Sequence, residues 1–375
     1  MTSFPHSIAI AGAWGYIGRQ FLDAALSLGL RIYALDPSDA PDDVDLSTIV
    51  RIEDEEAFYR LDADLFHLAL HPEHRGTAFD ILLERAATQQ LLILNEKPMA
   101  QPERPEQCAA TLDAVRGTQA VMLFDFLELF DPMVRAISRH LSQFDQVEIT
   151  DITLYRGKDR EDPERSRNYK KMVHIQYQES VHCLAFLLDL LGNVRGSLGG
   201  IFADGISITA RSQPYAPPNP QDYPYVVDGQ CAYEIELGKL HIDGRTDFKA
   251  GAEFAKRKIV RGFADGKPFV IEANTQEGKK YLRIDGVDRG FPADDSSYCH
   301  AIANLGEWYR TVDHRELMRG VYPNSHFARL TYQLSSVLWK SCDIGQTIAL
   351  PSAAELIAFD AGFAPECFPR YQPTN

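Results

Sequence analysis

The stretch IAIAGAWGYIG, residues 8–18, decides the fold of the N-terminal part of the chain. Its apolar run ends at Gly12, and Gly15 and Gly18 follow at three-residue intervals. Glycines between a strand and a helix allow a sharp turn and let the backbone approach a pyrophosphate closely. The spacing between the first two glycines is one residue longer than in the usual dinucleotide fingerprint. The stretch still predicts a strand, a tight turn and a dinucleotide-binding helix N-terminus.

The segments around this turn alternate between strand and helix patterns. We expect helices at residues 16–29, 55–61, 74–90 and 104–117, and strands at residues 7–12, 30–36, 63–70, 91–98 and 119–126. Strict alternation of strand and helix is typical of an α/β domain with a parallel, doubly wound sheet. We therefore predict a Rossmann domain over residues 1–126.

The pattern changes after residue 126. Residues 146–157 alternate polar and apolar side chains, and residues 194–291 contain several short strand patterns separated by turns. Helical patterns cover residues 132–144, 179–192 and 326–345. Such a pattern favours an open, mostly antiparallel sheet with helices. Residues 127–375 are predicted to form an α+β domain for substrate binding and oligomerisation.

Composition excludes several classes of function. The 375 residues carry a formal net charge of −15, which disfavours binding to nucleic acid or to anionic membranes. The six cysteines lie far apart, without a C-x-x-C pair, as expected for reduced thiols and no metal site. We find no signal peptide and no run of 18 apolar residues, so we expect a cytoplasmic location.

Asp36 ends the second predicted strand, close to the position where an acidic residue binds the ribose hydroxyls. Four further aspartates follow within nine residues, and no Arg or Lys occurs before Arg51. A 2′-phosphate would meet like charges there, so we predict NAD, with NADP less favoured. The residues predicted to bind the cofactor in this region are Gly12, Trp14, Gly15, Tyr16, Ile17, Gly18 and Asp36.

Trp14 is unusual in this turn. It either packs under the turn or lines the pyrophosphate or nicotinamide side of the cleft. We favour the second interpretation, because so large a side chain rarely hides completely in a turn.

The stretch NEKPMA, residues 95–100, follows a predicted parallel strand, and ligands of such sheets bind beyond the carboxyl ends of the strands. Lys97 can hydrogen-bond a substrate hydroxyl and stabilise negative charge that develops there. For the tripeptide alone, a solvated lysine in a loop is the simpler interpretation. His182, near the start of the helical pattern at 179–192, can accept a hydroxyl proton because histidine titrates near neutrality.

The chain resembles the glucose–fructose oxidoreductase and inositol dehydrogenase family (Gfo/Idh/MocA). The resemblance covers essentially the whole chain and rests on the N-terminal Rossmann pattern, Glu-Lys-Pro at residues 96–98 and the open-sheet second half. It implies that Lys97 contacts the substrate hydroxyl and the nicotinamide, and that Glu96 helps to hold the cofactor. His182 matches the family's helix histidine, and the Lys97–Pro98 bond is often cis in relatives.

The chain departs from the family pattern around His182. Gln178 stands four residues before it, where the family has Asp, and a glutamine cannot act as a base. Glu179 is a candidate replacement, since residues three apart share a helix face, but a solvated Glu at a helix start is an equal alternative. Leu129 replaces an Arg that is usual after the fifth strand. The candidate substrate contacts are Lys97, Tyr169, Tyr177, Gln178 and His182, and the candidate catalytic residues are Lys97, His182 and Glu179.

Residues 156–171 are rich in Arg and Lys, with acidic residues between them. A site for an anionic substrate is one interpretation, and a solvated loop is the favoured one.

These features predict an NAD-dependent oxidoreductase acting on a CH–OH group of a sugar, cyclitol or related polyol. Two alternatives stay open: a non-redox enzyme that uses NAD transiently for glycoside cleavage or epimerisation, and a weakly catalytic NAD-binding sensor or assembly protein. The short-chain dehydrogenases share the glycine spacing, but no tyrosine here has Lys four residues later. The resemblance also implies a homo-dimer or homo-tetramer.

Overall fold

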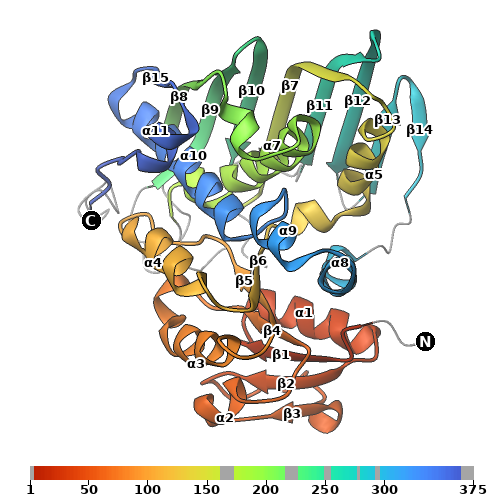
Figure 1. The fold of residues 1–375 in the computed structure, drawn as a ribbon, viewed down its shortest axis with the longest axis vertical. Coiled ribbons are helices and arrows are strands. Elements are labelled where there is room, and N and C mark those ends of the chain that lie inside the picture. The colour runs from red at the N-terminus through yellow and green to blue at the C-terminus, as the bar shows by residue number, and fades with distance from the viewer. Residues whose placement is uncertain are drawn as a thin grey trace. The chain divides into compact units, whose positions relative to one another are not determined.

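A computed structural model describes residues 4–160, 173–215, 227–248, 255–276, 279–291 and 296–364. The chain divides into two compact units. The first unit comprises Met1–Asp131 and Ser296–Arg329, and the second comprises Pro132–Asp295 and Leu330–Asn375. We describe each unit by itself (Figure 1).

The first unit is built on a six-stranded sheet in the order β3-β2-β1-β4-β5-β6, in which all neighbours are parallel. This is the order of a doubly wound dinucleotide-binding sheet, and the predicted α/β class of this part is confirmed. The strands are β1 (Ser7–Ala11), β2 (Arg31–Leu35), β3 (Ile49–Arg51), β4 (Leu65–Leu68), β5 (Leu91–Glu96) and β6 (Ala120–Asp125). The helices are α1 (Tyr16–Ser27), α2 (Glu55–Tyr59), α3 (Gly76–Ala86), α4 (Glu106–Val115), α8 (Ser297–Thr311) and α9 (His314–Arg319).

Residues 296–329 were predicted to belong to the second domain, and the contacts group them with the first unit instead. The reason is the apolar face of α8, which packs with α1 and one face of the parallel sheet. This core includes Ile10, Phe21, Ile302, Leu305 and Trp308, all buried. The single break expected at residue 126 is therefore replaced by a first unit made of two chain segments, the first of which ends at Asp131.

The second unit contains a nine-stranded sheet in the order β14-β13-β12-β11-β7-β10-β9-β8-β15. Only the pair β7–β10 is parallel, so the predicted mostly antiparallel sheet is confirmed. The strands are β7 (Val147–Gly157), β8 (Ile206–Tyr215), β9 (Val227–Leu237), β10 (Leu240–Asp247), β11 (Ala255–Ala264), β12 (Lys267–Gln276), β13 (Lys279–Ile284), β14 (Val287–Arg289) and β15 (Ile348–Leu350).

Helices cover one face of this sheet. They include α5 (Pro132–Leu141) and α7 (Ser180–Arg195), which lie against the sheet in Figure 1. The short helix α6 (Ile175–Gln178) precedes α7, and α10 (Ser325–Ile344) and α11 (Ala353–Ala358) come near the C-terminus. The side chains of β9 alternate between buried and exposed, so its other face is open.

Candidate active site

The three glycines of the turn after β1 have different local roles. Gly12 has a φ of +76°, and a Cβ there would lie 2.6 Å from the Ala69 carbonyl oxygen. A Cβ on Gly18 would lie 2.1 Å from the Gly12 oxygen, so this glycine allows α1 to pack on the turn. A Cβ on Gly15 would meet only the Gly12 oxygen, at 3.2 Å. Gly15 is the N-cap of α1, where a helix offers unsatisfied N–H groups to an anion.

Asp36 is oriented by the same turn. Its Oδ2 accepts a hydrogen bond from the backbone N–H of Trp14 at 3.0 Å, and its Oδ1 accepts one from Ser38 N at 3.0 Å. Each carboxylate oxygen has a second lone pair, so the group can still accept from a ribose hydroxyl. The carboxylate lies at the carboxyl end of β2, as predicted.

The Trp14 ring packs against the apolar core of the first unit, and so does Ile17. This placement agrees with the alternative in which Trp14 lies under the turn. The indole Nε1 is nevertheless buried without a hydrogen-bond partner in the described part of the chain. Tyr16, the first residue of α1, is 38% exposed. Of these three residues, Trp14 offers a side-chain donor for a ligand, and Ile17 offers only its backbone N–H.

The acidic segment after β2 is partly neutralised by two arginines. Arg19 of α1 binds Asp43 through two hydrogen bonds of 3.1 and 2.6 Å, and Arg51 of β3 lies 3.4 Å from Asp39. The prediction of NAD rested on the aspartates that follow β2 and on the lack of Arg or Lys between them and Arg51. Arg19 belongs to α1, which precedes β2 in the sequence, and the fold brings its side chain to Asp43 in this segment.

A buried cluster of ionisable groups lies at the carboxyl ends of β4, β5 and β6. Glu96 and Asp125 are register partners at the ends of their strands, and the charge of Glu96 raises the pKa of Asp125. His67 Nε2 lies 3.1 Å from Glu96 Oε1. Two neighbouring carboxyl groups in a buried site repel each other when both are charged, so this pair favours holding a proton in the core.

Burial sets the protonation of this cluster. It raises the pKa of Glu96 to about 7, against the opposing charges of Lys97 and Arg75. It raises the pKa of Asp125 well above its ordinary value, and the charge of Glu96 adds to the effect. It lowers the pKa of His67 to about 4. His67 is therefore neutral at pH 7, and its Nε2 lies within hydrogen-bond distance of the Glu96 carboxyl group.

Lys97 follows β5 directly and is the only lysine in the first 131 residues. The buried Arg75 fixes the loop that carries it, because its guanidinium donates to the carbonyl oxygens of Glu96 at 2.7 Å, Pro98 at 3.0 Å and Leu70 at 2.9 Å. The Lys97–Pro98 bond is cis, as the family resemblance implied. Lys97 thus lies on a held loop at the edge where ligands of parallel sheets bind.

Several buried polar atoms at this edge have no partner within the described residues. They are His67 Nδ1, Asp125 Oδ1 and both amide atoms of Asn95. Buried polar atoms are usually satisfied, and exceptions point to a missing ligand or water. Together with Trp14 Nε1, the N-terminus of α1 at Gly15 and the acceptor Asp36, these atoms fit a bound dinucleotide. Sequence reasoning missed His67 and Arg75, although a polar residue near the end of an apolar strand, as in ADLFHLAL, was an available signal.

In the second unit, Glu179 forms a buried ion-pair cluster. Its Oε2 accepts from Arg156 Nε at 2.7 Å, and its Oε1 accepts from Lys158 Nζ at 2.7 Å. Both cations come from the end of β7 and the residues after it. Burial lowers the pKa of Lys158 to about 7, against the charge of Glu179. Since both carboxylate oxygens bind cations, the arrangement argues against Glu179 as the base that replaces the family aspartate.

The same contacts revise the interpretation of the basic segment that begins at residue 156. Arg156 and Arg160 are buried, and Lys158 is partly buried. This first part of the segment is therefore not a solvated loop, because the fold places it against Glu179 and Phe248.

The other predicted residues near His182 have different surroundings. His182 lies in the first turn of α7 and is 9% exposed. Gln178 Oε1 accepts from the backbone N–H of Val173 at 3.1 Å. Tyr177 is fully buried and donates to Ser336 Oγ at 3.1 Å, which argues against the predicted contact with a substrate. Tyr169 lies outside the described residues.

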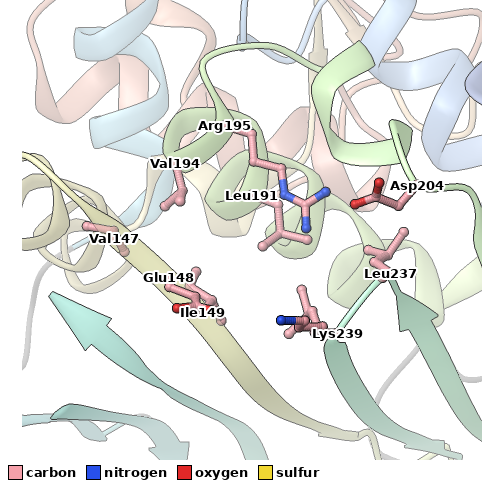
Figure 2. A pocket seen from close by; sticks show the side chains of 11 residues that line it. Val147, Glu148, Ile149, Leu191, Val194, Arg195, Asp204, Leu237 and Lys239 are labelled. Carbon is pink, nitrogen blue, oxygen red and sulfur yellow. The ribbon is translucent and has the colours of Figure 1, made fainter. Parts of the chain in front are cut away.

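A pocket of about 520 Å³ lies at the other end of α7. Figure 2 shows the Arg195 side chain extending from α7, with Asp204 and Lys239 on other sides of the pocket. Arg195 follows His182 by thirteen positions in α7, which corresponds to about 20 Å along the helix axis. This pocket is therefore separate from the surroundings of His182.

Within the described ranges, no group of three His, Cys, Asp or Glu side chains is placed to hold a metal ion. No described helix is long and apolar enough to cross a membrane.

Comparison with solved structures identifies the fold. A myo-inositol dehydrogenase from Corynebacterium glutamicum is 17% identical, with a TM-score of 0.66 over 92% of this chain and 99% of that one. A putative myo-inositol dehydrogenase from Sinorhizobium meliloti is 14% identical, with a TM-score of 0.68 over 92% and 100%. The transcriptional regulator Gal80p from Kluyveromyces lactis is 12% identical, with a TM-score of 0.63 over 95% and 93%.

The chain thus has the fold shared by these dehydrogenases and this regulator, as the family resemblance predicted. No family model matches the sequence, and no curated protein matches it. The assignment of function therefore depends on the residues of the site.

Proposed function

We propose that the protein is a nicotinamide-dependent oxidoreductase that acts on a hydroxyl-bearing carbon of a sugar, cyclitol or related polyol. The observation that carries the proposal is Lys97, held by Arg75 next to the buried Glu96–Asp125 pair at the carboxyl edge of a dinucleotide-type sheet. The dehydrogenases with the same fold support it. Buried, perturbed ionisable groups at such an edge are typical of catalytic sites.

The residues of the first unit supply binding and orientation. The N-terminus of α1 binds the pyrophosphate beside Gly15, and Asp36 accepts from the ribose hydroxyls. A bound nicotinamide supplies the hydride chemistry. Lys97 donates a hydrogen bond to the reacting substrate oxygen and stabilises its negative charge.

His182 takes or gives the proton of the substrate hydroxyl. Lys97 and His182 belong to different units, so the proposal requires that both reach one substrate. Gln178 and Glu179 are not needed as bases, since Gln178 cannot accept the proton and Glu179 is occupied by Arg156 and Lys158.

Lys97→Ala provides the test. Turnover, measured as NADH formation with a panel of polyols, should fall about 100-fold or more, because a positioned donor at the oxyanion is lost. NAD affinity, measured by fluorescence titration, should change much less. Arg104→Ala is the control, since it removes an exposed cation from the loop that follows Pro98. Unchanged turnover in Lys97→Ala would refute the assignment, and turnover without net NADH formation would favour the non-redox alternative.

We also propose NAD rather than NADP as the cofactor. The Asp36 carboxylate lies where a 2′-phosphate would be placed, and Arg19 and Arg51 are each bound to an aspartate. Titration with both reduced cofactors tests this, and tighter binding of NADPH would overturn it.

A second candidate function is a nicotinamide-binding regulator or sensor with little catalysis. It is supported by the regulator of the same fold. It is also supported by residues 178 and 179, since Gln178 has no carboxylate and that of Glu179 binds Arg156 and Lys158. NAD binding without turnover on any polyol would favour it. The homo-dimer or homo-tetramer remains a prediction, which light scattering can test.

A further inference from the structure

Two cysteines lie side by side in the second unit. Cys231 belongs to β9, and Cys342 belongs to the last turn of α10. Their sulfur atoms are 3.9 Å apart and share a hydrogen bond, and both are free thiols. They are 111 residues apart in the sequence, so the tertiary fold creates this pair.

Hydrogen-bond donors converge on the Cys342 sulfur. Gln176 Nε2 donates to it at 3.4 Å, and the Cys231 sulfur lies 3.9 Å away. Gln176 is itself buried and fixed, because its Nε2 also donates to Asp228 Oδ2 at 3.0 Å. A fixed amide donor and a neighbouring thiol favour the anionic form of this sulfur.

The surroundings of Cys342 shift its pKa in both directions, with a net lowering. The bond from Cys231 lowers the pKa of Cys342, as do Gln176 and Ser212, whereas burial and the Asp228 carboxylate raise it. The C-terminal turn of α10 also disfavours an anion. The pKa of Cys231 is raised well above its ordinary value, first by the bond to Cys342 and then by burial. The Cys342 thiol therefore ionises more readily than the Cys231 thiol.

The two cysteines also differ in solvent exposure. Cys342 is partly exposed, whereas Cys231 is fully buried. Cysteines that react with oxidants are accessible, have a lowered pKa and lie next to a second thiol that resolves the oxidised form. The pair combines these properties in one place.

We propose that Cys342 is a peroxide-reactive thiolate and that Cys231 resolves it to a reversible disulfide. The Cys342 sulfur attacks one oxygen of hydrogen peroxide, the O–O bond breaks, and the leaving hydroxide takes up a proton to become water. The resulting sulfenic acid is attacked by the Cys231 sulfur, which forms the S–S bond and breaks the S–O bond. The second oxygen leaves as water with the proton of Cys231. Peroxide accepts the two electrons that the two thiols lose.

The disulfide changes the contacts of α6. The Gln176 amide is held by the Cys342 sulfur and Asp228, and α6 leads directly into α7, which carries His182. Oxidation of the sulfur therefore acts on a segment that precedes the candidate active-site histidine. The redox proposal does not depend on the proposed enzymatic function, since its test reads the thiols themselves.

The experiment exposes the full chain to one equivalent of hydrogen peroxide, blocks the remaining thiols and identifies the peptides by mass spectrometry. The expected product is a Cys231–Cys342 linked peptide that a dithiol reductant removes. Cys299 is the internal control, because it is also partly exposed and its sulfur bonds to Ser27 Oγ instead of a thiol. Cys342 should react at least about tenfold faster than Cys299.

Three variants separate the roles. In Cys231→Ser, a sulfenic-acid probe should label Cys342, and in Cys342→Ser, Cys231 should stay reduced. Ser212→Ala should slow the reaction of Cys342 without changing that of Cys299, because the Ser212 hydroxyl lowers the pKa of Cys342. The proposal is overturned if Cys342 reacts no faster than Cys299. It is equally overturned if oxidised Cys342 in the unmodified chain does not form the link to Cys231.

Discussion

The buried proton of the Glu96–Asp125 pair predicts an unusual dependence of stability on pH, which Glu96→Gln isolates. Burial raises the pKa of Glu96 from 4.5 to about 7. The folded state therefore holds a proton that the unfolded chain releases above pH 4.5. A group of this kind contributes stability that is complete below the unfolded pKa and is lost as pH rises through the folded pKa. Glutamine is uncharged at every pH and keeps an acceptor for the His67 N–H.

The size of the effect follows from the two pKa values. Between pH 5 and pH 8, the free energy of unfolding of the unmodified protein should fall by about 2–3 kcal/mol relative to Glu96→Gln. His67 provides a control with the opposite sign, because burial lowers its pKa from 6.5 to about 4. The folded state binds fewer protons at this residue, so the unmodified protein should gain stability with pH relative to His67→Gln over pH 4 to 6.5.

The assay is urea unfolding at several pH values, analysed as the difference between each variant and the unmodified protein. Infrared spectroscopy adds a direct measurement, since the carbonyl band of a protonated carboxylic acid should persist at pH 7 and weaken in Asp125→Asn. A difference between the unmodified protein and Glu96→Gln that stays constant within about 0.5 kcal/mol from pH 5 to pH 8 would refute the reasoning.

Three further outcomes follow from the geometry. Gly18→Ala should destabilise the first unit by about 1–3 kcal/mol in urea unfolding, because its Cβ would lie 2.1 Å from the Gly12 oxygen. Gly15→Ala should cost less stability than Gly18→Ala, because its Cβ would lie 3.2 Å from the Gly12 oxygen, and it should weaken NAD binding in a fluorescence titration. Glu179→Gln should cost about 3–5 kcal/mol in urea unfolding, because it leaves buried cations uncompensated. Full stability with lost turnover would instead restore Glu179 as a base.

The sequence was sufficient to predict the parallel sheet, because each strand and helix there carries its own periodic pattern. It did not place α8 in the first unit. The apolar stripe that includes Ile302, Leu305 and Trp308 shows that α8 buries one face, but no local pattern specifies which sheet it covers. Long-range packing makes that choice, and with it the boundary between the units.

Some residues of the candidate site could likewise be predicted from the sequence, and others could not. Asp36 and Lys97 were predictable because each follows a strand at the edge where ligands bind. Tyr177 and Glu179 were not, because periodicity gives the face of a helix and not the partner that covers it. The hydroxyl of Tyr177 meets Ser336 of α10, and Glu179 meets Arg156 from β7, both from distant parts of the sequence.

The buried cluster bears on the choice between an enzyme and a regulator, which the shared fold does not decide. A fold gains little stability from His67, Glu96 and Asp125, because burying ionisable groups and leaving some of their atoms unsatisfied costs several kcal/mol. Apolar residues at these strand ends would pack with less cost. Proteins keep such destabilising arrangements mainly where function requires them. A proton held one residue from Lys97, at the edge where a nicotinamide would bind, therefore favours chemistry at this site over cofactor binding alone.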